Sequence, residues 1–306
     1  MRAVMIDLIL AHCQTDPDAL FLTGDLGFSV VEPLQEVLGE RFINAGIAEQ
    51  NMMTMAAALA DTGFRPYVYS IAPFVTARCF EQIRNDVCYH KKQVFIIGTG
   101  AGLSYGSLGP SHHSLEDAAI LATLPGMRVL SPANGAALAE VHRLALTSPG
   151  PAYFRVSRED GRDFAVPRFE DIRQAAHGIA DGTDICLVAT GPAVATALDA
   201  HDRLAAQSIS ASVISVPVLS PFPAKAVGAL LPDNAPVLGL FEGYAGGPLE
   251  LGLRRLLMTL RSSVPFAEVA IDHIYPDKAG STEFLRKTLG IDVDSVLAAA
   301  LDLLRS

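Results

Sequence analysis

The sequence predicts an α/β protein with two doubly wound domains whose sheets are mostly parallel. Short apolar runs alternate along the chain with segments of helical periodicity, which is typical of β-α-β units. Half of the 306 residues are hydrophobic and 18% are charged, and this length allows about two domains with a large core. A polar, weakly periodic stretch, EDGRDFAVPRFEDIRQAAHG, separates two series of apolar runs. We therefore expect one domain over residues 1–160, a linker over 161–178 and a second domain over 179–306.

Apolar runs and helical spacing place the individual elements. Expected strands of the first domain, with the turns that follow them, are 19–27, 65–71, 93–103, 127–134 and 151–159. Expected helices of the first domain are 1–13, 43–63, 77–90, 114–126 and 135–150. In the second domain we expect strands at 185–191, 211–219, 235–243 and 266–275, and helices at 193–206, 248–260, 282–290 and 294–304.

Charge and cysteine content narrow the class of protein. The net charge is -10 and no run of Lys or Arg occurs, which argues against nucleic acid or an anionic membrane as the main partner. No apolar stretch reaches the length that spans a bilayer, and Asp7 interrupts the apolar run at the start of the chain. The four cysteines have neither CxxC spacing nor a disulfide framework. We therefore expect a protein of the reducing cytoplasm.

A single acid, Glu49, lies in the apolar stretch INAGIAEQNMMTMAAALADTG. Its spacing predicts a helix with Asn44 as N-cap and Gly63 as the C-terminal stop. Met52 and Met53 follow Glu49 by three and four residues, which puts the carboxylate on the apolar stripe. Two interpretations remain open: a functional carboxyl group in an apolar setting, or a solvated Glu favoured by the helix dipole.

The loop GLSYGSLGPSHHSLEDA is rich in glycine and follows a buried strand. Ligands of open α/β sheets gather at such strand ends. His112 and His113 are therefore candidates for acid-base chemistry or for hydrogen bonding to a substrate oxygen, unless they are plain surface histidines. No spaced third ligand points to a metal. Ser114 and Asp117 suggest a capping box for the next helix.

Two arginines, Arg155 and Arg158, lie at the end of the strand AYFRVSRED. A guanidinium at that place can clamp a phosphate or a carboxylate through two hydrogen bonds. The alternative is an ion pair with the adjacent Glu159 or Asp160. The segment TGDLGF near the first strand is neither a Walker loop nor G-x-G-x-x-G, and we expect a simple turn there.

Several ordered motifs together resemble the transketolase family. AGIAEQNMMTMAAALADTGFRPYVYS, FVTARCFEQIRNDV, GLSYGSLGPSHHSLEDAAILATLPGMRVLSPAN and PAYFRVSRED are similar to its pyrimidine-binding domain. LVATGPAVATAL, LFEGYAGGPL and IDHIYPDKAGSTEFL resemble its C-terminal domain. The resemblance covers essentially the whole chain, so the two expected domains correspond to these two family domains.

The resemblance implies roles for individual residues. Glu49 corresponds to the family Glu that shares a proton with N1′ of thiamin diphosphate, which favours the 4′-imino tautomer that deprotonates thiazolium C2. Phe74 corresponds to an aromatic residue that stacks on the aminopyrimidine, while an upstream position that is often Phe reads Ile71. His112 corresponds to the residue beside the substrate carbonyl and hydroxyl groups. Arg158 corresponds to the arginine that binds the substrate phosphate.

Other positions match the family residues less closely or differ from them. His113 and Arg155 are secondary candidates for contact with the substrate. Leu108 stands where many transketolases have an Asp that contacts a substrate hydroxyl. An apolar side chain cannot accept that hydrogen bond, which points to a donor other than a common pentose phosphate.

The resemblance also implies a partner. The Gly-Asp-Gly motif that holds Mg²⁺ and the cofactor diphosphate in full transketolases is missing, and TGDLGF has Leu26 in place of the second glycine. We therefore expect the C-terminal subunit of a split transketolase, which transfers a two-carbon ketol unit from a phosphorylated ketose to an aldehyde. An N-terminal subunit would hold Mg²⁺ and the diphosphate, in a heterotetramer with two copies of each subunit, and this chain alone could form a homodimer. The alternatives are the beta subunit of a 2-oxoacid dehydrogenase and a non-catalytic regulatory subunit.

Overall fold

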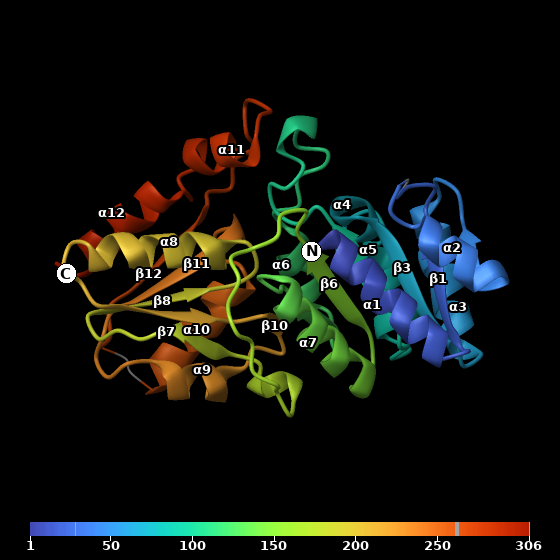
Figure 1. Cartoon of the computed structure of the whole chain (residues 1–306), viewed down its shortest axis with the longest axis horizontal. Helices are drawn as coiled ribbons and strands as arrows, with labels where there is room; N and C mark the ends of the chain where they lie inside the picture. Colours follow the sequence, from blue (N-terminus) through green and yellow to red (C-terminus); the bar gives the residue numbers. More distant parts are fainter. Residues whose placement is uncertain (28, 261–262, 306) are drawn as a thin grey trace.

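Two mainly parallel β-sheets organise the chain, as the alternation of strands and helices predicts (Figure 1). The structure is a computed structural model, and it describes residues 1–27, 29–260 and 263–305. Phe28, the last residue of the expected turn TGDLGF, lies outside the described residues. Within the described part of the chain, no helix is both long enough and apolar enough to cross a membrane.

The first sheet has seven strands in the order β10-β5-β6-β4-β3-β1-β2. Neighbours are parallel except β10, which runs antiparallel to β5. The central strands are buried on both faces, and this matches their continuous apolar sequences. The strand bounds are β1 (Ala19–Thr23), β2 (Phe42–Asn44), β3 (Arg65–Ile71), β4 (Phe95–Thr99), β5 (Arg128–Leu130), β6 (Ala152–Val156) and β10 (Val218–Ser220).

Helices cover both faces of this sheet. Two groups of buried apolar side chains form on its opposite faces, one from α1, α2 and α7 and the other from α3, α6 and the π-helical turn Ile83–Cys88. The helix bounds are α1 (Arg2–Thr15), α2 (Glu32–Leu38), α3 (Glu49–Asp61), α4 (Ala72–Val75), α5 (Phe80–Gln82), α6 (Asp117–Ala122) and α7 (Gly135–Thr147), with 3₁₀ turns η1 (Gly39–Arg41) and η3 (Gly106–Leu108).

The second sheet has five strands in the order β12-β11-β8-β9-β7, with β7 antiparallel to β9. Helices α8 and α12 lie on one face, and α9 and α10 on the other (Figure 1). The bounds are β7 (His177–Ala180), β8 (Ile185–Ala189), β9 (Ala211–Ser215), β11 (Val237–Tyr244), β12 (Phe266–Ile271), α8 (Ala193–Ala205), α9 (Ala224–Leu230), α10 (Pro248–Leu260), α11 (Thr282–Thr288), α12 (Val293–Leu303) and the 3₁₀ turn η4 (Ile172–Gln174).

The stretch 211–219 differs from the single strand that we expect from its sequence. It divides into β9 of the second sheet and β10 of the first, with Val216 and Pro217 between them. Proline has no backbone N–H to continue the β9 ladder, but its carbonyl accepts a hydrogen bond from the Ser131 N–H at 2.8 Å. The second half of the chain therefore completes the first sheet. Near the start of the second half of the chain, His177 and Gly178, which we expect in the linker, belong to β7.

Helix α3 begins later than its sequence suggests. Asn44 is the last residue of β2, and α3 starts at Glu49 with Ala48 as its N-cap. The Asn44 side-chain oxygen instead accepts hydrogen bonds from the N–H groups of Asp25 and Gly46, both at 3.0 Å. The expectation for Asn44 is therefore wrong, because its side chain orders the strand-to-helix turn. The helix ends at Asp61, close to the expected stop at Gly63.

The capping box expected at Ser114 and Asp117 is also absent, since Glu116 is the N-cap of α6 and its side chain makes no capping bond. Asp117 turns inward and accepts hydrogen bonds from the Tyr153 hydroxyl at 2.6 Å and from Nε of Arg155 at 2.9 Å. A buried guanidinium without a partner is costly. The carboxylate of Asp117 therefore pairs with Arg155 and does not cap the helix.

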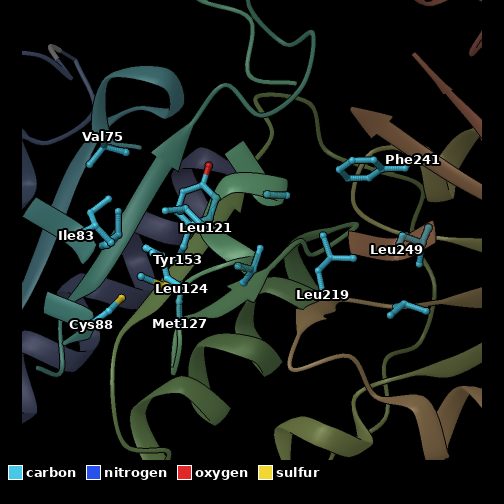
Figure 2. Close-up of a cluster of buried hydrophobic side chains, with 14 of the residues drawn as sticks. Val75, Ile83, Cys88, Leu121, Leu124, Met127, Tyr153, Leu219, Phe241 and Leu249 are labelled. Carbon is cyan, nitrogen blue, oxygen red and sulfur yellow. The ribbon is translucent and has the colours of Figure 1, made fainter. Parts of the chain in front are cut away.

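Apolar side chains from both halves of the chain join the two sheets. Leu219, Phe241 and Leu249 of the second half belong to the same buried cluster as Leu121 and Tyr153 of the first half (Figure 2). Packing on this scale favours one fixed arrangement of the sheets, because each buried aliphatic or aromatic side chain contributes about 1.5–3 kcal/mol.

Burial of His177 predicts acid sensitivity of the fold. The centre of its ring lies 5.7 Å from that of Phe164 and 5.8 Å from that of Phe169, and neither ring nitrogen has a hydrogen-bond partner among the described residues. Burial lowers the pKa of His177 from 6.5 to about 4. The folded state therefore resists protonation, so this contribution to stability is fully present above pH 6.5 and is lost as the pH falls toward 4.

Between pH 6.5 and pH 4, we expect the free energy of unfolding to fall less in the His177→Phe variant than in the wild-type protein. The difference should be on the order of 3 kcal/mol. Urea unfolding across this pH range measures the difference. Exposed His90 provides the control, and His90→Phe should leave the pH dependence unchanged. If the free energy of unfolding depends on pH in the same way in wild type and His177→Phe, the proposed contribution of His177 is wrong.

Candidate active site

The candidate site lies where the parallel strands of the first sheet end. Glu49 opens the helix after β2, Phe74 lies in α4 after β3, His112 lies in the loop after β4, and Arg158 follows β6. The carboxyl ends of parallel strands meet at one edge of a sheet, so residues far apart in sequence are brought together there.

Glu49 is buried, with 3% of its surface exposed, at the first position of α3. Met52 and Met53 are fully buried beneath it, as the helical stripe predicts. Its Oε2 atom accepts a hydrogen bond from Nη1 of Arg78 at 2.8 Å. Its Oε1 atom has no hydrogen-bond partner among the described residues. Gly24 lies close by, because a Cβ atom there would stand 3.5 Å from Cγ of Glu49.

Arg78 links Glu49 to the candidate stacking residue Phe74. The Arg78 guanidinium carbon lies 4.3 Å from the centre of the Phe74 ring, in a cation–π contact. A hollow of about 400 Å³ opens beside this group and is lined by residues 47–51 and Arg78. The hollow therefore borders the carboxylate of Glu49, and Arg78 connects it to the Phe74 ring.

His112 continues the cluster from Phe74 toward Arg158. Its ring stands edge-on to Phe74 at 5.2 Å and to Tyr105 at 6.1 Å between ring centres. Its Nδ1 atom lies 3.0 Å from the Ser111 hydroxyl. Arg158 is exposed, and its guanidinium carbon lies 4.9 Å from the centre of the Tyr105 ring. The contacts therefore form one continuous series from the carboxylate of Glu49 to the guanidinium of Arg158.

The second domain fixes the loop that carries Tyr105 and His112. The Leu103 N–H donates to Oε1 of Glu242 at 2.9 Å, and the Thr282 hydroxyl donates to the Leu103 carbonyl at 3.3 Å. Gly102 has a φ of 61°, and a Cβ atom there would stand 2.1 Å from Oε1 of Glu242. Only glycine therefore allows this close approach without a shift.

Arg155 has a structural environment instead of the substrate contact that we expect from the sequence. Its side chain is fully buried, and besides Asp117 it donates to the carbonyls of Ser114 at 2.8 Å and Glu242 at 2.7 Å. Full burial leaves the guanidinium no route to an exposed ligand, although its Nη1 atom has no hydrogen-bond partner among the described residues. The structure therefore corrects the expectation for Arg155.

The remaining expected residues lie at the margin of the cluster. His113 is buried, its Nε2 atom lies 3.3 Å from the Gly106 carbonyl, and burial lowers the pKa of its imidazole. This inward position does not favour contact with a substrate. Ile71 is half-buried at the end of β3, one turn before Phe74. Leu108 lies in η3 and is 52% exposed.

Sequence reasoning missed Arg78 and Tyr105, although both join the predicted residues to one another. A signal for Arg78 was available, since it follows Phe74 by four residues, the spacing that lets side chains meet on a helical turn. Tyr105 gave no such signal, because its place against Arg158 depends on how the loop folds. Among the described residues, no group of three or more His, Cys, Asp or Glu side chains is placed to hold a metal.

Comparison with protein families identifies both halves of the chain. Residues 1–163 match the transketolase pyrimidine-binding domain, and residues 175–296 match the transketolase C-terminal domain. The chain therefore belongs to the transketolase family, and its enzymes are transferases. A transketolase pyrimidine-binding domain implies an enzyme that depends on thiamin diphosphate.

Within the family, the chain resembles the separate C-terminal subunit of split transketolases over its full length. It is 29% identical to one subunit of the apulose-4-phosphate transketolase of Phocaeicola vulgatus, over 99% of this chain and 97% of that protein. It is 30% identical to a 6-deoxy-6-sulfo-D-fructose transketolase subunit of Clostridium sp., over 98% of this chain and 93% of that protein.

Solved structures support the same placement. A split-gene transketolase described as an inactive beta4 tetramer superposes with a TM-score of 0.86 at 30% identity, covering 99% of this chain and 97% of that one. The transketolase of Leishmania mexicana shares the fold with a TM-score of 0.83 at 20% identity, and the match spans 45% of its chain.

Proposed function

We propose that this chain supplies the pyrimidine-binding and substrate-binding side of a thiamin diphosphate-dependent ketol transferase. It would act with an N-terminal partner subunit and move a two-carbon ketol unit from a ketose with an anionic end group to an aldehyde. One observation carries the proposal: the continuous series of contacts that joins Glu49, Phe74, His112 and Arg158 at one edge of the first sheet.

The residues fit the aminopyrimidine of the cofactor. Oε1 of the buried Glu49 is an open acceptor, and the Phe74 ring, which Arg78 covers on one side, would stack on the aminopyrimidine through its other face. Glu49 would hold a proton at N1′, and Phe74 would orient the ring. Thiamin diphosphate, when bound, supplies the carbanion equivalent that attacks a ketose carbonyl.

The substrate would lie along the exposed side of the cluster. His112 is placed to hydrogen-bond a carbonyl or hydroxyl oxygen, and Arg158 to bind a terminal phosphate. The relatives' substrates, apulose 4-phosphate and 6-deoxy-6-sulfo-D-fructose, both carry an anionic group at a chain end. This shared chemistry supports an anionic ketose as the donor.

A partner subunit is part of the proposal. Relatives of this length are named as single subunits of a transketolase, and full transketolases are about twice as long as the part that matches this chain. The partner would hold Mg²⁺ and the diphosphate in a cytoplasmic assembly with two copies of each subunit. Self-association of this chain alone is supported by the beta4 tetramer of the split-gene relative. The family match favours this function over a 2-oxoacid dehydrogenase subunit, and the assembled set of side chains favours it over a non-catalytic role.

The first functional prediction concerns Glu49. The Glu49→Gln variant keeps the shape of the side chain but has no carboxyl proton to share with N1′. We expect the kcat of the complex with the partner subunit to fall by about 10²–10⁴-fold. Glu81→Gln, on an exposed position of α5, is the matched control and should keep full activity. Near-normal turnover of Glu49→Gln would refute its role.

The second functional prediction separates Arg158 from His112. Arg158→Ala should raise the KM for a phosphorylated ketose by about 10- to 100-fold, since it removes hydrogen bonds between charged groups. It should hardly change the KM for the unphosphorylated sugar. His112→Ala should lower kcat with either donor. Equal losses for both donors in Arg158→Ala would count against an anion site.

The third functional prediction tests the partner by isothermal titration calorimetry. Thiamin diphosphate with Mg²⁺ should bind this chain weakly or not at all, because its diphosphate would have no ligands here. Addition of the N-terminal subunit should produce tight binding. Tight, Mg²⁺-dependent binding together with full turnover by this chain alone would contradict the two-subunit proposal.

A further inference from the structure

The guanidinium of Arg158 has two acidic neighbours in sequence, Glu159 and Asp160, and either could form an ion pair with it. Neither does so among the described residues. Asp160 contacts the amine of Met1. Glu159 turns away and accepts a hydrogen bond from Nη2 of Arg286 at 2.9 Å. Arg158 is left stacked on Tyr105 with its donors exposed.

Arg286 belongs to α11 of the second domain, 127 residues beyond Glu159, and α11 lies beside the loop that follows β4 (Figure 1). Its Nε atom donates to Oε2 of Glu242 at 2.6 Å. Glu242 is 2% exposed and is fixed in turn by the Leu103 N–H. The guanidinium therefore divides its donors between a buried carboxylate and a half-exposed one. Its position is set by the buried partner.

We propose that Arg286 is a positioning residue for the anion site, which acts by holding the carboxylate of Glu159 away from Arg158. This inference rests on the proposed function, in which Arg158 binds the anionic end of the donor. The ligand class is a tetrahedral oxyanion, such as a sugar phosphate or a sulfonate. The second domain thus sets how strongly the first domain binds an anionic substrate.

Electrostatics gives the reason for such an arrangement. A carboxylate beside Arg158 would occupy the donors that a phosphate needs and would also repel the phosphate. Arg286 prevents both effects because its fork satisfies Glu242 and Glu159 at once. Lysine cannot do this in the same way, since its ammonium is a point charge without the planar fork.

The decisive variant is Arg286→Lys in the complex with the partner subunit. The ammonium should remain with the buried Glu242, whose charge is costly to leave unpaired, and release Glu159. We expect the KM for a phosphorylated ketose to rise about tenfold, with no change for the unphosphorylated sugar. Arg203→Lys, at an exposed ion pair with Asp294, is the matched control and should change neither value.

A second substitution distinguishes positioning from structural support. Adding Glu159→Gln to Arg286→Lys removes the released carboxylate and should restore the KM for the phosphorylated donor. A merely structural role predicts no such rescue. Equal effects on both donors, or failure of Glu159→Gln to rescue, would overturn the proposal.

A chemical readout on this chain makes the inference independent of turnover. Phenylglyoxal modifies accessible arginines, and mass spectrometry follows the modification of Arg158 in the folded full chain. Arg286→Lys should slow this modification severalfold, and Glu159→Gln in the same chain should restore the wild-type rate. Unchanged modification of Arg158 in Arg286→Lys would refute the inference. Absence of ketol transfer in every chain, with the labelling pattern intact, would reject the proposed function alone.

Discussion

The buried guanidinium of Arg155 joins three parts of the molecule that are far apart in sequence. It stands on β6, pairs with Asp117 at the start of α6, and donates to the carbonyls of Ser114 and Glu242. Ser114 lies at the end of the loop that carries His112, and Glu242 belongs to β11 of the second sheet. Because a buried charge is costly without partners, these contacts favour fixed relative positions of the sheet, the loop and the second domain.

Four arginines around this edge have different surroundings. Arg155 is buried and committed to structure, and Arg286 bridges two carboxylates at the domain junction. Arg78 is shared between a buried carboxylate and an aromatic ring, and Arg158 lies on an aromatic ring with open donors. Among these four, Arg158 is the one that is exposed and has no carboxylate partner among the described residues. These surroundings, more than its place in the sequence, support the proposal that Arg158 binds an anion.

Much of the fold could be predicted from the sequence, because buried parallel strands and amphipathic helices leave periodic patterns. The failures have local physical causes. Asn44 satisfies a turn instead of a helix end, and Pro217 divides one apolar run between two sheets. The sequence singles out Glu49 because an acid among apolar residues is conspicuous, and its proposed role rests on the family resemblance. The contacts that join the site residues were harder to predict. The pair of Glu159 and Arg286 spans 127 positions, and nothing local in either segment indicates it. Such contacts depend on how the two sheets dock, and that docking emerges only from the whole chain.

The second domain is therefore part of the site as well as a neighbour to it. It adds β10 to the first sheet, it fixes the loop of His112 through Glu242, and it holds Glu159 through Arg286. The contacts of Glu242 and Arg286 act near the edge where the parallel strands end, whereas β10 extends the sheet beside β5. Under the proposed function, the open face of the cluster would receive a partner subunit, while the opposite face is supported from within the same chain. The proposal thus gives a physical reason for keeping the two domains on one chain: the loop of His112 and the position of Glu159 depend on charges and backbone groups of the second domain.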